Sequence, residues 1–236
     1  MAKKPLKRPE SLAVAYSSKR WNILHLLREK AKQIMKPLEK SNLAPVVHGS
    51  IARGDISSKS DIDIFLPTQA SSFTIQSTLE KANITPIRLY VVQATPNYAM
   101  KAHIEIDEGI TVSFPLMKLR KVEREFYKFG GEINLDDLQK DLRVVGVDKR
   151  LMLIEPTKEG HVENTIMGRE EHVAHVLDVS VETVSDRVHA LSRRDDVGRT
   201  GVFMKQELPD GKTFEMLLEE LAKKNPAIRR RLTSQP

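Results

Sequence analysis

Residues 48–66 read HGSIARGDISSKSDIDIFL, and this stretch decides the fold. Asp61 and Asp63 are two positions apart in an apolar-rich run, so on a β-strand both carboxylates point to the same side of the sheet. The dipeptide Gly49-Ser50 precedes them and predicts a turn whose backbone N–H groups cradle a phosphate. The stretch therefore predicts a site for a nucleoside triphosphate and a divalent metal ion.

The spacing suits magnesium, because Mg²⁺ prefers oxygen ligands and binds through one or two carboxylates together with substrate phosphates. Phosphoryl or nucleotidyl transfer depends on positioning and charge neutralisation more than on covalent help from the protein. We expect Asp61 and Asp63 to bind Mg²⁺ or Mn²⁺, and Ser50 with the amides around Gly49 to hold the β- and γ-phosphates. Arg53 has two interpretations: it neutralises phosphate charge, or it fixes the turn that follows it.

These residues resemble the signature of the nucleotidyltransferase superfamily, which includes DNA polymerase β, the CCA-adding enzymes and the aminoglycoside nucleotidyltransferases. That signature is Gly-Ser, a variable spacer, and then Asp-x-Asp on the next strand, and here Asp61-Ile62-Asp63 follows Gly49-Ser50. The resemblance implies that Asp61 and Asp63 are catalytic metal ligands. It also implies that the NTP is contacted by four positions, which are Gly49, Ser50, Arg53 and Ser60.

Some members of the superfamily keep the fold and lose the chemistry, so turnover depends on a third carboxylate, usually on a later strand after a hairpin turn. Residues 101–115 alternate apolar and polar side chains and predict such a hairpin. A turn at residues 107–109, with Gly109 in the left-handed position, pairs Ile106 with Ile110. In that register two pairs lie on the polar face, Glu105 with Thr111 and His103 with Ser113.

The archaeal CCA-adding enzymes have similar sequence around this hairpin, and Tyr98 and residues 115–119 are the matching positions. Where that family has its aspartate, this chain has Ser113. We therefore expect Glu105, on the same face of the neighbouring strand, to be the third metal ligand and, by analogy, to accept the proton of the attacking hydroxyl. The alternative is a surface glutamate on a hairpin. Asp107, in the turn, is the weaker candidate.

The first part of the chain alternates helical and strand-like patterns, which predicts an α/β domain over residues 1–155. We expect a small mixed sheet flanked by helices. The expected helices span 11–38, 71–82 and part of 118–141, and the expected strands are 44–47, 62–66, 87–92, the hairpin at 101–116, and 151–154.

The turn-rich segment 155–160 predicts a domain boundary, followed by a mainly helical, winged-helix-like domain over 160–236. Residues 170–191 resemble a helix-turn-helix, in which Ala174 allows two helices to approach and Ser180 is the N-cap of the second. Residues 201–214 contain Asp-Gly, a turn signal, and predict a wing-like hairpin before a closing helix at 214–224.

The chain carries a net charge of +6, which favours polyanionic partners. Its basic clusters lie at both ends, at residues 3–8, 223–224 and 229–231. On the expected second helix of the helix-turn-helix, Glu182 and Asp186 repel phosphate. Sequence-specific DNA reading is therefore the weaker use of this helix, and RNA docking or protein contact are the alternatives. The enzyme-like core favours RNA as the polyanion that the basic clusters bind, and the other interpretation of these clusters is that they are solvated tails.

Composition excludes several classes of protein. The 236 residues contain no cysteine, which rules out disulfides, thiolate catalysis and cysteine-based zinc sites. The sequence contains no run of about 18 apolar residues, so we expect no membrane span. The first basic cluster is not followed by the apolar segment of a signal peptide, so we expect no such signal. We expect a cytoplasmic protein with no membrane partner.

Two functions fit the sequence. The first is a metal-dependent nucleotidyltransferase that moves a nucleotidyl group from an NTP to an acceptor, with RNA preferred and a protein or small molecule as alternatives. The second is a nucleotide-binding module without turnover, coupled to a helix-turn-helix regulator or adaptor. The Asp61/Asp63 pair favours the enzyme, whereas Ser113 in place of an aspartate favours the binding module.

Overall fold

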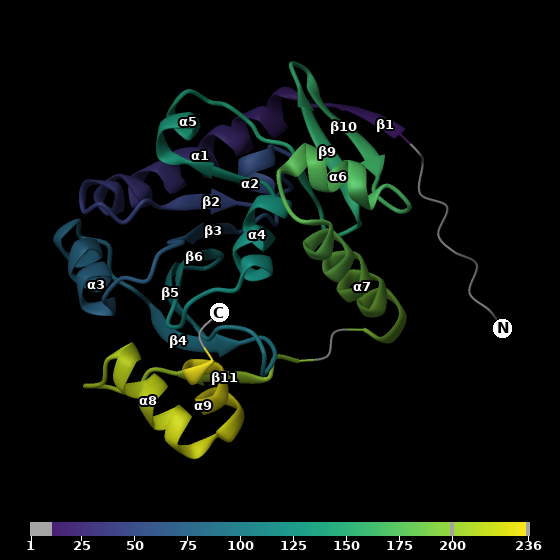
Figure 1. Cartoon of the computed structure of the whole chain (residues 1–236). Helices are drawn as coiled ribbons and strands as arrows, with labels where there is room; N and C mark the ends of the chain where they lie inside the picture. The colour runs from purple at the N-terminus through teal and green to yellow at the C-terminus, as the bar shows by residue number, and fades with distance from the viewer. Residues whose placement is uncertain (1–10, 199–200, 235–236) are drawn as a thin grey trace.

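The computed structural model describes residues 11–198 and 201–234, and a seven-stranded mixed sheet lies at its centre (Figure 1). Its strands are β2 (Val46–His48), β3 (Ile62–Phe65), β4 (Arg88–Gln93), β5 (Lys101–Asp107), β6 (Ile110–Pro115), β7 (Glu132–Asn134) and β11 (Met204–Glu207). They are ordered β11-β4-β5-β6-β3-β2-β7. Only β3 and β6 run parallel; the other neighbours in this sheet are antiparallel.

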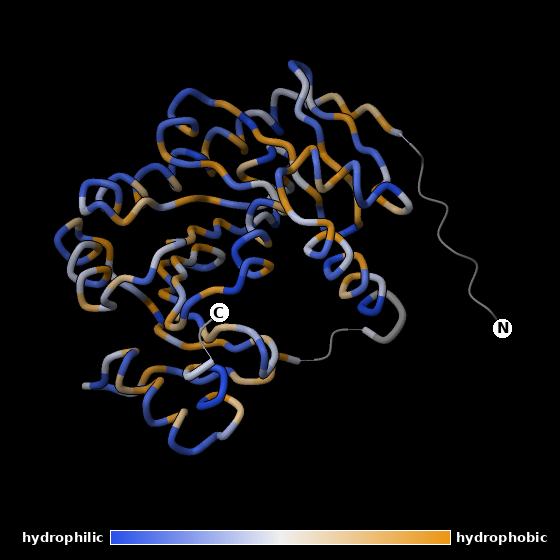
Figure 2. Tube along the Cα trace, viewed as in Figure 1, coloured by the Kyte–Doolittle hydropathy of each residue, from blue (hydrophilic) through white to orange (hydrophobic). Residues whose placement is uncertain are grey.

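Helices flank this sheet, and the α/β fold class predicted from the sequence is confirmed. The helices are α1 (Ser18–Lys40), α2 (Ser50–Arg53), α3 (Ser72–Lys81), α4 (Lys121–Phe129), α5 (Leu135–Gln139), α8 (Phe214–Lys224) and α9 (Pro226–Thr233). Figure 2 shows hydrophobic residues along β2 and an alternation of hydrophobic and hydrophilic residues along α8. Burial of the apolar faces of these helices on the strands forms one main core.

A second, four-stranded sheet packs beside the first and has its own small core. Its strands, in spatial order, are β1 (Ser11–Ala15), β10 (Gly160–Thr165), β9 (Met152–Thr157) and β8 (Gly146–Val147). Helices α6 (Glu170–Leu177) and α7 (Val181–Val197) complete this unit. Leu153 of the sheet, Val173 of α6 and Val184 of α7 belong to its buried cluster.

The predicted first helix is wrong at its start, because residues 11–15 form the edge strand β1. Ser17 then caps α1, its side chain accepting a hydrogen bond from the Arg20 amide. β1 pairs with β10, where Val14 lies opposite His161. A Cβ atom on Gly160 would lie 1.8 Å from the Val14 carbonyl oxygen, so this close approach requires glycine. The apolar residues of β1 suited both interpretations, and only the long-range pairing selects the strand.

The hairpin of β5 and β6 has most of the predicted register. Glu105 lies opposite Thr111 and His103 opposite Ser113, as expected. The predicted pair Ile106–Ile110 is wrong, because a register shift after Glu105 places Asp107 opposite Ile110. Gly109 has the predicted left-handed backbone, with a φ of 75°.

The expected domain boundary at 155–160 falls inside the hairpin of β9 and β10, which pair along their whole length. The chain after α7 then returns to the first sheet. β11 pairs with β4, with Met204 opposite Gln93, and Phe214 of α8 lies in the main core (Figure 1). The predicted wing-like hairpin over 201–214 is therefore not formed, because the hydrogen bonds of β11 go to the edge of the large sheet.

A short turn joins helices α6 and α7, and Ser180 caps α7 as predicted, since its side chain accepts from the Thr183 amide. This turn is bound to α4: the Glu125 carboxylate accepts from the Ser180 amide at 2.9 Å and from the Thr183 hydroxyl at 2.6 Å. Lys128 of α4 also forms an ion pair with Asp178 at 3.0 Å. These contacts fix the start of α7 against the large-sheet unit.

Within residues 11–198 and 201–234, no helix has the length and apolar character needed to cross a lipid bilayer. The basic cluster at residues 3–8 lies outside the described residues.

Candidate active site

The Gly-Ser turn and the Asp-x-Asp strand are adjacent, because β2 pairs with β3 and His48 lies opposite Asp63. Gly49 has a φ of 80°, and its N–H donates to the Gly131 carbonyl at 2.8 Å. The hydroxyls of Ser50 and Ser60 are 3.1 Å apart, which links the turn to the segment that leads into Asp61. The four motif residues predicted to surround a phosphate are thus brought together, although the Gly49 N–H is already bonded to the protein.

This motif forms one side of a cavity of about 440 Å³, here called the polar lobe. Asp61 and Asp63 line it together with hydroxyl and basic side chains from both units of the fold. The hydroxyls and cations are Ser50, Ser57, Ser60, Lys59, Lys149, Arg150, Arg187 and Arg194. A lobe with several cations near two carboxylates suits a polyphosphate that carries a divalent metal ion.

The two aspartates of the motif repel each other. Burial among the walls of the cleft and the nearby Asp61 carboxylate raise the pKa of Asp63, and Lys149 partly opposes this effect. Both side chains nevertheless reach the solvent of the cleft. Gly109 packs beside Asp61, since a Cβ atom there would lie 3.1 Å from Asp61 Oδ1. The hairpin turn therefore helps to hold Asp61 in place.

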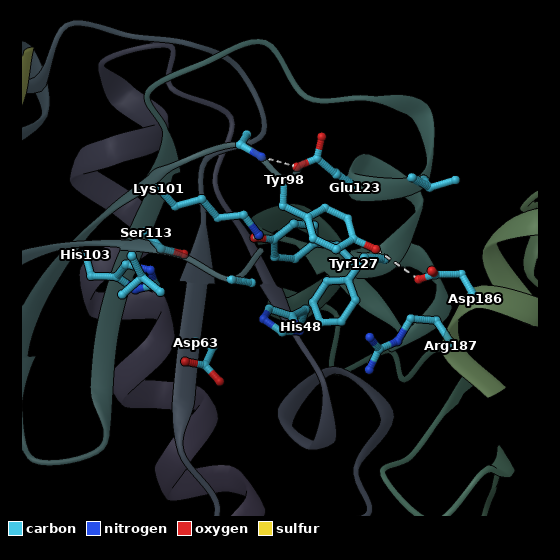
Figure 3. A pocket seen from close by; sticks show the side chains of 15 residues that line it. His48, Asp63, Tyr98, Lys101, His103, Ser113, Glu123, Tyr127, Asp186 and Arg187 are labelled. Atoms are coloured by element: carbon cyan, nitrogen blue, oxygen red, sulfur yellow. Dashed lines mark hydrogen bonds between the residues drawn. The ribbon is translucent and has the colours of Figure 1, made fainter. Parts of the chain in front are cut away.

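A second cavity of about 350 Å³ adjoins the first, and the two share His48, Asp63, Phe126 and Arg187 as lining residues. This aromatic lobe lies between the strands β4–β6 and the helices α4 and α7 (Figure 3). Its other labelled lining residues are Tyr98, Lys101, His103, Ser113, Glu123, Tyr127 and Asp186. Asp63 thus lies at the junction of a charged lobe and an aromatic one.

Arg53 is held by the protein itself. Its guanidinium forms an ion pair with Asp55 at 2.9 Å and donates to the carbonyls of Gly130 and Val147. The side chain is 5% exposed. The structure favours the interpretation in which Arg53 fixes the following turn, because both terminal nitrogens of its guanidinium donate to protein acceptors.

The structure does not bring Glu105 to the two aspartates as a third metal ligand. Its carboxylate forms an ion pair with Arg88 at 2.6 Å, and Thr111 of β6 lies between its strand and Asp63. Among the described residues, no group of three or more His, Cys, Asp or Glu side chains is placed to hold a metal ion. Glu105 lies opposite Thr111 as predicted, but strand β6 lies between the strand of Glu105 and the strand of Asp63.

We therefore expect the substitution Glu105→Gln to leave nucleotide binding and any transfer activity within about threefold of wild type, because Glu105 bonds to Arg88 and β6 separates its strand from that of Asp63. Isothermal titration with an NTP and Mg²⁺, and a transfer assay, would check this. A steep loss of either would restore Glu105 to the site.

Several residues of the cleft were missed by sequence reasoning. Lys149 and Arg150 follow β8, and Arg187 and Arg194 lie on α7, so both pairs come from the second unit. The cluster Asp148-Lys149-Arg150 was a visible charge signal, but nothing local placed it opposite Ser50. Lys101 lies on a strand of alternating apolar and polar residues, and nothing in the sequence marked it as a residue of the cleft.

The mixed sheet, the Gly-Ser turn and the paired aspartates define a nucleotidyl-transfer type of fold. Residues 28–169 match a family model described as a nucleotidyltransferase domain. This range covers more than half of the chain, and the chain therefore belongs to that family. Searches of curated proteins and of solved structures gave no match.

Proposed function

We propose that this protein transfers a nucleotidyl group from an NTP to an acceptor, with Asp61 and Asp63 as ligands of Mg²⁺ or Mn²⁺. Membership of the family supports nucleotidyl transfer in general. The observation that supports the proposal most is the position of Asp63, at the junction of a polar lobe with several cations and an aromatic lobe. A reaction that joins a polyphosphate to a second substrate needs such a junction.

The residues present fit a hard divalent cation. Two carboxylates with mutual repulsion supply oxygen ligands, and substrate phosphates can complete the coordination. When bound, the metal would neutralise charge that develops on the phosphates. Ser50 and Ser60, linked through their hydroxyls, would contact the phosphates next to it, with Lys59 and Lys149 as further cations of the polar lobe.

The two lobes divide the roles of the substrates. In nucleotidyl transfer the attacking and leaving oxygens lie in line on opposite sides of the phosphorus. If pyrophosphate leaves on the side of the Gly49-Ser50 turn, the acceptor approaches across Asp63, from the aromatic lobe. We assign the triphosphate to the polar lobe and the acceptor to the aromatic lobe on this basis.

RNA is the acceptor that we favour. Lys223, Lys224, Arg229 and Arg230 are exposed on α8 and α9, whereas Arg231 is buried in an ion pair with Glu123 at 3.0 Å. Arg231 therefore has a structural role, and the other four basic residues remain exposed for contact with a polyanion. The exposed side of α7 carries Glu182 and Asp186, which makes this helix a poor reader of DNA.

A second candidate is a nucleotide-binding module without turnover. The observation that favours it is that no third carboxylate joins Asp61 and Asp63 among the described residues. Such a protein would bind NTP and metal in the same cleft and leave the nucleotide intact.

One experiment separates the two candidates. The full-length protein is incubated with each α-labelled NTP, Mg²⁺ and total RNA, and label is followed on RNA and on the protein. The enzyme proposal expects label on RNA with release of pyrophosphate. Binding of NTP without label on any acceptor, RNA, protein or small molecule, would favour the binding module.

A further inference from the structure

The aromatic lobe contains two cations, Lys101 and Arg187, that form no close ion pair with a carboxylate of the described residues. Lys101 of β5 donates from Nζ to the Tyr127 hydroxyl at 2.8 Å and lies 4.8 Å from the centre of that ring. Arg187 of α7 lies over the ring of Phe126, and its Nε has no hydrogen-bond partner. Both line the same cavity (Figure 3), and the acids that act on them there are Glu123 for Lys101 and Asp186 for Arg187.

The acids that line this lobe are bound elsewhere. Both carboxylate oxygens of Glu123 accept hydrogen bonds, one from the Ala99 amide and the other from Arg120 and Arg231. Asp186 is exposed and accepts from the Tyr98 hydroxyl at 3.0 Å (Figure 3). Asp63, the remaining acid, is the ligand that the proposed metal uses.

Burial is the main influence on the charged groups of the lobe, and the two cations also act on each other and on a neighbouring histidine. Burial, and the nearby Arg187, lower the pKa of Lys101 to about 8, although Glu123 opposes the shift. Burial and the Lys101 ammonium lower the pKa of His103 to about 4. Burial lowers the pKa of Arg187, and Asp186 opposes this shift. An anion bound between Lys101 and Arg187 would reduce their mutual repulsion.

Lys101 and Arg187 are partly buried and make hydrogen-bond and cation–π contacts with aromatic side chains, but their charge is not matched by a close ion pair and stays available to an anionic ligand. Three aromatic rings lie near these cations, those of Phe65, Phe126 and Tyr127, and the rings of Phe65 and Tyr127 stack with centres 3.6 Å apart. This combination of an aromatic wall with two cations is suited to a flat ring that carries a phosphate.

We propose that Lys101 and Arg187 bind a phosphate group of the acceptor, so that the acceptor is a nucleotide or the end of an RNA chain rather than an uncharged molecule. That the bound molecule is the acceptor rests on the proposed function. The phosphate site itself rests on Lys101 and Arg187. Tyr98 and Phe126, at the same cavity, supply apolar surface for the base.

The proposal is tested by the difference in affinity between adenosine 5′-monophosphate and adenosine, measured by calorimetry on the full-length protein. We expect the monophosphate to bind at least about tenfold more tightly, as charge-assisted hydrogen bonds allow. The substitutions Lys101→Met and Arg187→Gln should each reduce this preference several-fold. Lys36→Met, at an exposed position of α1 outside both lobes, is the matched control and should preserve it.

The stability of Lys101→Met supplies a second measurement. Because methionine has a similar shape, we expect the melting temperature to stay within about 5 °C of wild type, so that a lost phosphate preference reports the missing ammonium and not unfolding. Retention of the full preference in both Lys101→Met and Arg187→Gln would overturn the proposal. Loss of the preference in Lys59→Met, in the polar lobe, together with its retention in Lys101→Met would overturn it as well.

The source of the phosphate is distinguished by a third ligand, an adenosine dinucleotide with a single internal phosphate. Binding at least as tight as that of the monophosphate would indicate an RNA end, and weaker binding a free nucleotide. These measurements need no turnover, so they hold if the enzyme proposal fails. Conversely, transfer by wild type with unchanged transfer by Lys101→Met would contradict only this inference.

Discussion

The substitution Asp63→Asn is expected to reduce nucleotidyl transfer by more than about 100-fold, since loss of a direct metal ligand should exceed the 10–100-fold cost of changing a group behind one. The fold should survive, because Asp63 is exposed to the cleft and its charge is repelled by Asp61. Transfer rates at saturating NTP and Mg²⁺, together with thermal unfolding, would measure both effects.

The matched control is Asp107→Asn. Asp107 is an exposed carboxylate at the end of β5, and its Oδ1 accepts from the Glu108 amide at 2.8 Å. Its substitution should leave the transfer rate unchanged. Full activity in Asp63→Asn as well would contradict the proposed metal site. It would also contradict the assignment of triphosphate and acceptor to the two lobes that meet at Asp63.

The second large effect is on stability: Phe214→Ala should lower the free energy of unfolding by about 3–5 kcal/mol. Phe214 begins α8, is fully buried, and contacts Phe114 of β6 edge to face, with ring centres 5.6 Å apart. The cost arises because the lost ring leaves a cavity in the main core beneath the large sheet.

Met216→Ala is the control for this experiment, since Met216 lies on the same helix and is 48% exposed. Its effect should stay within about 0.5 kcal/mol. Urea unfolding of both variants, followed by circular dichroism, would give the comparison. Equal effects of the two substitutions would mean that α8 does not belong to the core of the nucleotidyltransferase fold.

The sequence was most informative where a local pattern carries the chemistry. The Gly-Ser turn, the aspartate pair, and the register that sets Glu105 opposite Thr111 all depend on residues close together in the chain, and the structure has each of them. Gly109 was predictable for the same reason, since a tight turn needs a left-handed residue.

The remaining features depend on long-range pairing. β11 adds to the edge of β4 across more than a hundred residues, and nothing within Met204–Glu207 indicates that partner rather than a local hairpin. Glu105 was placed on the correct face, but its distance from Asp63 depends on β6 lying between the two strands. Lys101 and Arg187 meet in one cavity only because α7 is bound to α4 through Glu125.

The central claim is that the cleft transfers the α-phosphoryl group with its nucleoside and releases pyrophosphate. Parallel incubations with NTP labelled at the α- or the γ-phosphate, each with Mg²⁺ and RNA, test this directly. We predict that the α-label appears on the acceptor and the γ-label only in pyrophosphate, and that Asp63→Asn abolishes both. Transfer of the γ-label to an acceptor, or nucleotide that stays intact while bound, would contradict the claim.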